Sequence, residues 1–156
     1  MGAKSCPGKE LYPHLFSPIR IGNIRLKNRI IAAPTSPSMI TTEGFFTPEM
    51  RAYLEEKAMG GAAVVTYGEA IVHSKTGKSH NKQVELDRFG VRQEMAPVAH
   101  AIHNAGAYAN IQLSHGGKYG GLASVGGDHT ACEVAYGPSH ELLPEGEVFE
   151  MPREMI

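Results

Sequence analysis

Three short apolar runs, separated by two segments with helical spacing, limit the folds open to this chain. The runs cover residues 30–33, 62–67 and 109–113, and the first two show no regular alternation of apolar and polar side chains. A run of that kind is typical of a strand that is buried on both faces, as in a parallel sheet. Because strands that alternate with helices favour parallel βαβ units, the sequence predicts an α/β fold.

The segments between the runs are predicted to be helices. Thr47 can cap a first helix over residues 48–59, since Pro48 suits the first helical position and Gly60 stops the helix. A second helix is indicated by apolar residues at helical spacing, which are Val91, Met95, Val98 and Ile102. Pro97 lies inside this pattern and lacks a backbone donor, so the helix either begins late or kinks there.

Two further regions flank this unit. Residues 19–26 alternate apolar and polar residues around Gly22 and Asn23, which tolerate the positive φ of a tight turn, so we expect a β-hairpin. Residues 114–156 are rich in glycine and proline and show no sustained period. We expect a long loop without a clear element there, and in a compact domain such a loop indicates either a functional segment or an incomplete chain.

Composition and charge argue against several classes of function. The net charge is −1 and both signs are spread along the chain, so no basic field favours nucleic acid or a membrane surface. No apolar stretch approaches the ~20 residues that cross a bilayer, and the N-terminus lacks the pattern of a secretory signal. We therefore expect a soluble, cytoplasmic protein. Its two cysteines supply neither a disulfide framework nor the four thiolates of an iron–sulfur cluster.

In parallel βα folds, ligands bind where the strands end, so the residues that follow each run are candidates for a site. They are residues 34–36, 67–69 and 112–117, and most of them are small, polar or amide-bearing. The Gln112 carboxamide can donate and accept, which matches the edge of a flavin pyrimidine. A hydroxyl of Thr35 or Ser36 could donate near the reactive nitrogen of a flavin. On the pattern alone, purely structural loops are an equal alternative.

Other residues of catalytic type have a simpler structural interpretation. His115 and Glu69 could act as bases, but the pattern favours a loop residue for the first and a polar rim residue for the second. His100 and His103 are three apart on the second predicted helix, yet no cysteine or carboxylate is evident as a further ligand. We predict neither a metal ligand nor a catalytic residue among these side chains.

Five motifs, in order, are similar to those of the old yellow enzyme family. The opening signature comprises LFSPI, IGN, LKNRI and AP within residues 15–34, and the second and third strand motifs lie in residues 60–68 and 106–118. Residues 136–139 (YGPS) and 151–155 (MPREM) resemble markers of the family's long loop after its third strand. The resemblance covers nearly all of the chain from Leu15 onward. It is nearest to the bacterial branch of 2-enoate and 2,4-dienoyl-CoA reductases.

The resemblance implies a (β/α)8 TIM barrel that binds FMN at its C-terminal face. Such a flavin-dependent oxidoreductase passes a hydride from NAD(P)H through FMN to the C=C bond of an activated alkene, its small-molecule substrate. Carried over by position, the cofactor-binding residues are Ala33, Pro34, Thr35, Ser36, Gly68 and Gln112. The family usually has Met or Leu at the position of Thr35, and Thr or Cys at that of Ser36. Lys118 stands where the family has an arginine, and lysine cannot form a bidentate contact.

The resemblance also predicts how much of the barrel is present. A (β/α)8 barrel needs roughly 200 residues or more. We expect a tail over residues 1–14 and, over 15–156, a truncated FMN-binding domain with the hairpin, three βα units and a long loop. The family's substrate-anchoring pair and its tyrosine would follow Ile156, so we expect an incomplete chain without turnover of its own, and possible homo-oligomers. An iron–sulfur cluster and FAD would belong only to a longer parent.

Three alternatives stay open at this point. The chain could be the product of a truncated gene. It could be a non-catalytic βα binding module for a small ligand or a protein. It could also be another barrel enzyme such as an aldolase, for which Lys118 is the only lysine near a strand end.

Overall fold

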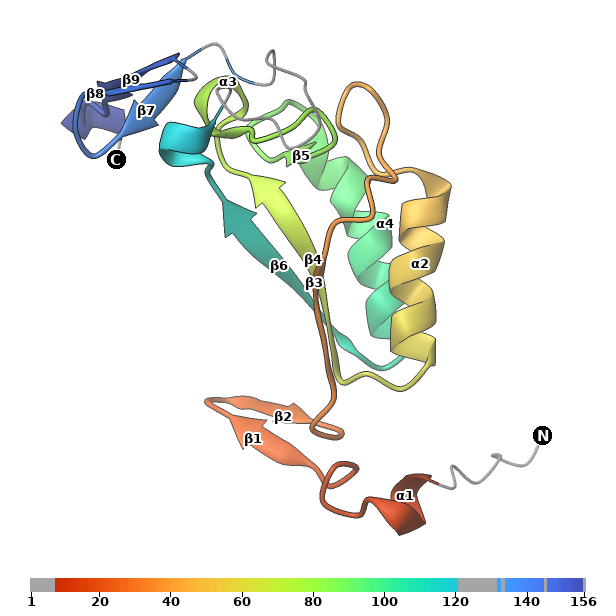
Figure 1. Ribbon diagram of the computed structural model, residues 1–156. Coiled ribbons are helices and arrows are strands. Elements are labelled where there is room, and N and C mark those ends of the chain that lie inside the picture. Colours follow the sequence, from red (N-terminus) through yellow and green to blue (C-terminus); the bar gives the residue numbers. More distant parts are fainter. Residues whose placement is uncertain (1–7, 121–131, 133, 145, 156) are drawn as a thin grey trace.

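A parallel sheet forms the centre of the computed structural model, which describes residues 8–120, 132, 134–144 and 146–155. Strand β4 (Val64–Ile71) lies between β3 (Ile31–Thr35) and β6 (Tyr108–Ser114), and runs parallel to both (Figure 1). The short β5 (Val84–Glu85) pairs with residues 70 and 71 of β4. Because β6 occupies the other edge of β4, β5 continues the sheet on the side of β3.

All three predicted strands are present, with shifted ends. The first extends to Thr35, two residues past the apolar run over 30–33. Proline cannot donate to a sheet ladder, and the pairing of β3 with β4 shifts register between Ala32 and Thr35, where Pro34 lies. The second strand continues past Tyr67 to Ile71, which places Gly68 inside β4.

Helix α2 (Pro48–Met59) has the bounds that the sequence predicts. The Thr47 hydroxyl accepts a hydrogen bond from the backbone N–H of Met50 at 3.3 Å, and Pro48 occupies the first turn. Met50, Leu54 and Ala58 are buried and lie four residues apart, so they form one stripe on the helix. This stripe belongs to the same core as Val65 of β4.

Helix α4 (Val91–Asn104) begins after Gly90, whose φ of 87° suits glycine, and continues through Pro97. A late start of this helix is therefore wrong. Val98 and Ile102 are buried in the core that α2 also enters. In Figure 1 both helices lie on the same side of the strands, so the other face of β3, β4 and β6 is not covered by a described helix.

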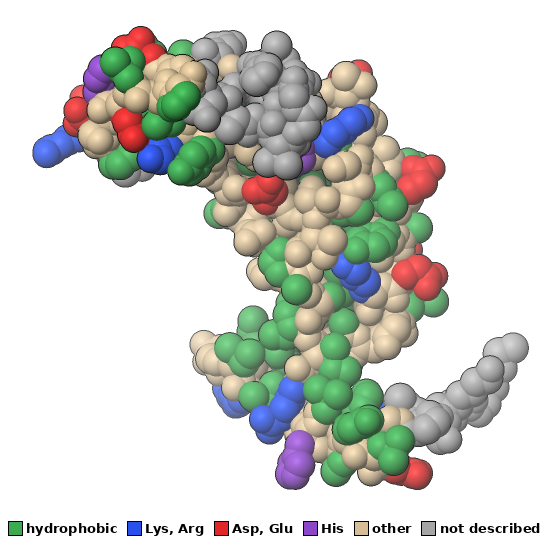
Figure 2. All heavy atoms as spheres, in the orientation of Figure 1, with side chains coloured by type: hydrophobic (Ala, Val, Ile, Leu, Met, Phe, Trp, Pro, Cys, Tyr) green, Lys and Arg blue, Asp and Glu red, His purple; other side chains and the backbone are tan. Residues whose placement is uncertain are grey.

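The N-terminal hairpin is confirmed. Strand β1 (Ile19–Ile21) pairs antiparallel with β2 (Ile24–Leu26), below the sheet in Figure 1, after the one-turn helix α1 (Gly8–Leu11). The Asn28 side chain donates to the carbonyl of Gly61 at 2.8 Å and accepts from the backbone N–H of Ile30 at 3.0 Å, so it links the end of the hairpin to the starts of two strands. Figure 2 shows hydrophobic side chains gathered on the hairpin and the lower end of the sheet.

The C-terminal region is not the elementless loop that the sequence predicts. Three short strands, β7 (Ala135–Gly137), β8 (Glu141–Leu143) and β9 (Gly146–Glu150), form a second sheet in the order β7-β9-β8. Two 3₁₀ turns, η1 (Gly117–Tyr119) and η2 (Arg153–Met155), flank it. Residues 121–131 of the predicted loop lie outside the described residues. Among the described helices, none combines the length and apolarity that crossing a membrane requires.

A chain of side-chain hydrogen bonds joins the loops above the sheet. The backbone N–H of Gly117 donates to Nδ1 of His115 at 3.0 Å, so neutral His115 carries its proton on Nε2. That proton is donated to Thr76 in the one-turn helix α3 (Ser74–Gly77) at 3.0 Å, and the Thr76 hydroxyl also forms a hydrogen bond of 2.8 Å with Nδ1 of His73. Burial, and then the nearby His73, lower the pKa of His115 below its usual value of 6.5.

The core predicts the effect of a large-to-small substitution. Leu54 is fully buried, so Leu54→Ala should lower the free energy of unfolding by about 2 to 5 kcal/mol, measured by urea denaturation followed by circular dichroism. Glu56→Ala, at an exposed position of the same helix, should change it by no more than about 0.5 kcal/mol. Equal effects of the two variants would show that α2 is not packed as described.

The histidine chain predicts a pH dependence. A lowered pKa in the folded state means that the unfolded chain binds more protons below about pH 6.5, so the contribution of His115 is present above that pH and is lost as pH falls. Urea midpoints measured from about pH 7.5 to 5 should therefore fall more steeply for the wild type than for His115→Gln. His103→Gln, at an exposed site on α4, should retain the wild-type slope. Parallel profiles of the wild type and His115→Gln would contradict the assignment.

Candidate functional site

The carboxyl-terminal parts of β3 and β6 lie beside Gly68, which is inside β4. A Cβ atom at this position would lie 2.5 Å from Oε1 of Gln112 on β6 and 2.6 Å from Cβ of Pro34 on β3. Neither distance leaves room for a side chain, so glycine is required by close approach. The structure thus brings together one predicted residue from each strand. Their role in holding a cofactor stays a prediction.

The sheet is irregular at this level. The pairing of β4 with β6 shifts register between Tyr67 and Ala70, and that of β3 with β4 shifts between Ala32 and Thr35. Such irregularities change which face a side chain occupies, and they are common beside functional sites. The register shift in β3 explains why neighbouring side chains of this strand face different parts of the structure.

The Thr35 hydroxyl is already engaged within the chain. It donates to the carbonyl of Ala33 at 3.2 Å and accepts from Nζ of Lys57 on α2 at 3.3 Å. The side chain therefore turns toward the helical layer, and its proton is in use. Of the two hydroxyls that the sequence offers as flavin donors, Thr35 is the less available. Ala33 is exposed on the same strand, and its carbonyl is the partner of Thr35.

The Ser36 hydroxyl, in contrast, is buried and has no hydrogen-bond partner among the described residues. The hydroxyl of Tyr67 on β4 is also buried and has no hydrogen-bond partner among the described residues. A buried hydroxyl without a partner costs about 1 to 3 kcal/mol, so such groups usually have a role. Burial raises the pKa of Tyr67, and the neighbouring Ser36 hydroxyl lowers it in part. Tyr67 lies within the candidate range 67–69, but it was not among the residues that the family resemblance assigned to the cofactor.

Glu69 follows Gly68 on β4, and its carboxylate is held in place. Oε2 accepts from the hydroxyl of Ser114 at 2.8 Å, and Oε1 accepts from Nε2 of Gln83. Gln83 is fully buried, and its carbonyl accepts from two backbone N–H groups of its own loop. The ring of His80 lies 3.6 Å from the same carboxylate. The Glu69 carboxylate is therefore held in a fixed position and presents a polar surface. Sequence reasoning missed Gln83 because it lies in a loop that no motif marks.

Lys118 does not have the surroundings of a Schiff-base lysine. Its Nζ lies 3.1 Å from Oε2 of Glu141 on β8, and this carboxylate raises its pKa. A lysine nucleophile needs a lowered pKa, so the aldolase alternative loses its only candidate. His100 and His103 lie at exposed positions on α4. Within the described ranges, no three His, Cys, Asp or Glu side chains gather as a metal site would require.

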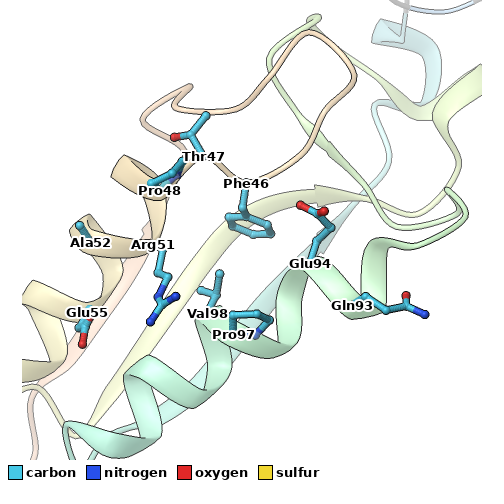
Figure 3. A pocket seen from close by; sticks show the side chains of 10 residues that line it. All are labelled: Phe46, Thr47, Pro48, Arg51, Ala52, Glu55, Gln93, Glu94, Pro97 and Val98. Carbon is cyan, nitrogen blue, oxygen red and sulfur yellow. The ribbon is translucent and has the colours of Figure 1, made fainter.

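A separate hollow lies in the helical layer. It is a cavity of about 430 Å³ between the first halves of α2 and α4. Figure 3 shows Arg51 and Glu55 on one side of it and Glu94 on the other. None of the residues predicted to contact a cofactor lines it. The candidate site is therefore the face at the strand ends, and not this cavity.

Three known proteins illustrate what the chain resembles. It is 28% identical over 158 residues to cinnamate reductase from Clostridium sporogenes, covering 95% of this chain and 23% of that protein. A solved complex of 2-naphthoyl-CoA reductase superposes with a TM-score of 0.77 at 26% identity, over 92% of this chain and 23% of that one. Old Yellow Enzyme from a Pichia species gives 0.74 at 21% identity, over 90% and 38%, and supports the fold alone. The chain spans less than two fifths of each of the three.

These likenesses confirm two expectations from the sequence. The α/β unit is part of a TIM barrel of the old yellow enzyme type, since both solved structures match about nine tenths of the chain. The family model described as NADH:flavin oxidoreductase / NADH oxidase matches residues 14–154. That family implies FMN as the cofactor and a nicotinamide as the reductant. The chain belongs to the NADH:flavin oxidoreductase / NADH oxidase family.

Proposed function

We propose that the strand ends of this chain form one wall of an FMN site, in an enzyme that reduces activated alkenes with NAD(P)H. The close approach of Gly68 to Pro34 and Gln112 carries the proposal. It lets the exposed side chains of Pro34 and Gln112 lie together over the buried Gly68, and they form a compact surface against which a flat ring can lie, with a carboxamide at its edge. The buried, unpartnered Ser36 hydroxyl is a second feature that fits, because a bound acceptor would satisfy it.

Each residue has a distinct part in this proposal. Pro34 and Gly68 shape the surface and exclude water from one face of the ring. Gln112 would bind the pyrimidine edge, since a carboxamide matches alternating donors and acceptors. Ser36 would donate toward the N5 and C4 carbonyl region, and a donor there stabilises negative charge in the reduced ring. When bound, FMN supplies hydride transfer between the nicotinamide and the substrate carbon.

The alkene part of the proposal rests on the named relatives. Cinnamate reductase and 2-naphthoyl-CoA reductase are both named for unsaturated acids or their thioesters. We infer a substrate with a C=C bond conjugated to a carbonyl group. A binding module without redox chemistry is the alternative, and it predicts FMN binding without any alkene-dependent oxidation.

Titration with FMN, followed by flavin fluorescence, tests the site. Gln112→Glu preserves the shape of the side chain but replaces an amide donor with a carboxylate, so it should weaken binding about tenfold or more. Asn110→Asp is the matched control, because Asn110 lies two residues earlier on β6 and its amide contacts Thr66 at 3.3 Å. It should bind as the wild type does. A wild-type chain that does not bind FMN would refute the site.

A single-turnover experiment tests the substrate class. The FMN complex is reduced under anaerobic conditions and mixed with cinnamate or with its saturated analogue. We expect reoxidation by the alkene alone, and faster than for free reduced FMN, because the site orients the ring. Rates equal to those of free reduced FMN would count against alkene reduction and would favour the binding-module alternative.

A further inference from the structure

The cavity between α2 and α4 is separate from the strand-end site and has a wall of its own. Its volume is about 430 Å³, and cavities that hold small molecules usually measure roughly 300 to 1,000 Å³. All of its lining residues belong to the two helices or to the two positions that precede α2. The cavity therefore has the size of a ligand site and does not depend on the strand ends.

Three charged side chains line this cavity without a partner of their own. Arg51 and Glu55 come from α2, and Glu94 comes from α4 on the opposite side (Figure 3). Arg51 and Glu55 are four residues apart, a spacing at which ion pairs commonly form on a helix. Within the described ranges, however, no ion pair or side-chain hydrogen bond involves any of the three. All three charges are available to a ligand.

The rest of the wall supplies apolar surface and a backbone acceptor. Phe46, Pro97 and Val98 form the apolar part. Pro97 has no N–H to donate to the carbonyl of Gln93, which lies four residues earlier in α4 and also lines the cavity. This carbonyl therefore lacks its usual helical partner and can accept a hydrogen bond from a ligand.

The apolar part of the wall is fixed before any ligand binds. The ring of Phe46 packs edge-to-face on Tyr67 of β4, with centroids 4.8 Å apart, and only 4% of Tyr67 is exposed. Val98 is buried in the core that α2 and α4 share. A wall formed in advance lowers the ordering cost of binding.

We infer that this cavity binds a free amino acid with an apolar side chain. The guanidinium of Arg51 binds the carboxylate, because its planar fork matches two oxygens. Glu94, together with the carbonyl of Gln93, accepts hydrogen bonds from the ammonium group. The apolar side chain of the amino acid packs on Phe46 and Val98. The ligand thus joins α2 to α4.

The charges of the wall select against other ligands. Two carboxylates outnumber the one arginine, so phosphates and other polyanions are repelled. An amine without a carboxylate leaves Arg51 without a partner, and a carboxylate without an amine does the same to Glu94. Each of these ligands gives up one charge-assisted hydrogen bond.

An NMR titration of the isotope-labelled chain with L-leucine tests the site. We expect shifts in resonances of α2 and α4, and the same dissociation constant with or without FMN. Isoamylamine and isocaproate keep the apolar group of leucine but lack its carboxylate or its ammonium group, so each should bind about tenfold or more weakly. Absence of leucine binding, equal binding of either analogue, or competition by FMN would overturn the inference. Because leucine binds without FMN, failure of the proposed function leaves this inference standing.

Charge-matched variants locate the ligand. Arg51→Gln and Glu94→Gln should each weaken leucine binding about tenfold or more, since each removes a charge-assisted hydrogen bond. Arg92→Gln on α4 and Glu56→Gln on α2 are the controls, because neither residue lines the cavity, and both should bind as the wild type does. All four positions are exposed, so the variants should fold, as circular dichroism can verify. Wild-type affinity in Arg51→Gln, or equal losses in the controls, would place leucine elsewhere and refute the site.

Discussion

The packing of β4 against strands at both edges and against helices on one face is the constraint on which the rest of the structure depends. Strands β3 and β5 share one edge of β4 and β6 takes the other, while α2 and α4 cover one face. Val65 and Tyr67 enter the core with the helices. Because side chains alternate along a strand, Thr66 between them is directed away from that core. A single strand therefore contributes residues both to the hydrophobic core and to the candidate site.

The close approach of Pro34 and Gln112 to Gly68 connects the packing of β4 with the candidate site. Pro34 and Gln112 can lie against the glycine only if β3 and β6 are held at fixed positions on β4, and the helical core holds them there. The Glu69 carboxylate adds a second tie, since it is bound by Ser114 and by a buried glutamine. A site built on three strands in this way is rigid before any ligand arrives, which lowers the ordering cost of binding.

The sequence was informative where local rules govern the structure. Thr47 as the cap and Pro48 at the first position were enough to predict α2, and the apolar runs were enough to locate three strands. In these segments, intrinsic propensity and burial favour the same structure. It failed for β7, β8 and β9, whose runs of three to five residues among glycines and prolines give no periodic signal. The sequence offered both Thr35 and Ser36 as candidate donors. It could not show that, beside a register shift, the Thr35 hydroxyl binds Lys57 while the Ser36 hydroxyl has no partner among the described residues.

Two of the three departures from the family pattern gain a physical meaning from their surroundings. Ser36 retains a hydroxyl but lacks the methyl group of threonine, so its rotamer is less restricted. Lys118 loses the planar fork of arginine, and its ammonium binds Glu141 of β8 instead. A point charge needs only one partner, and that partner ties η1 to the C-terminal sheet. The lysine therefore acts between loops, while the glycine and amide at the strand ends belong to the proposed cofactor site.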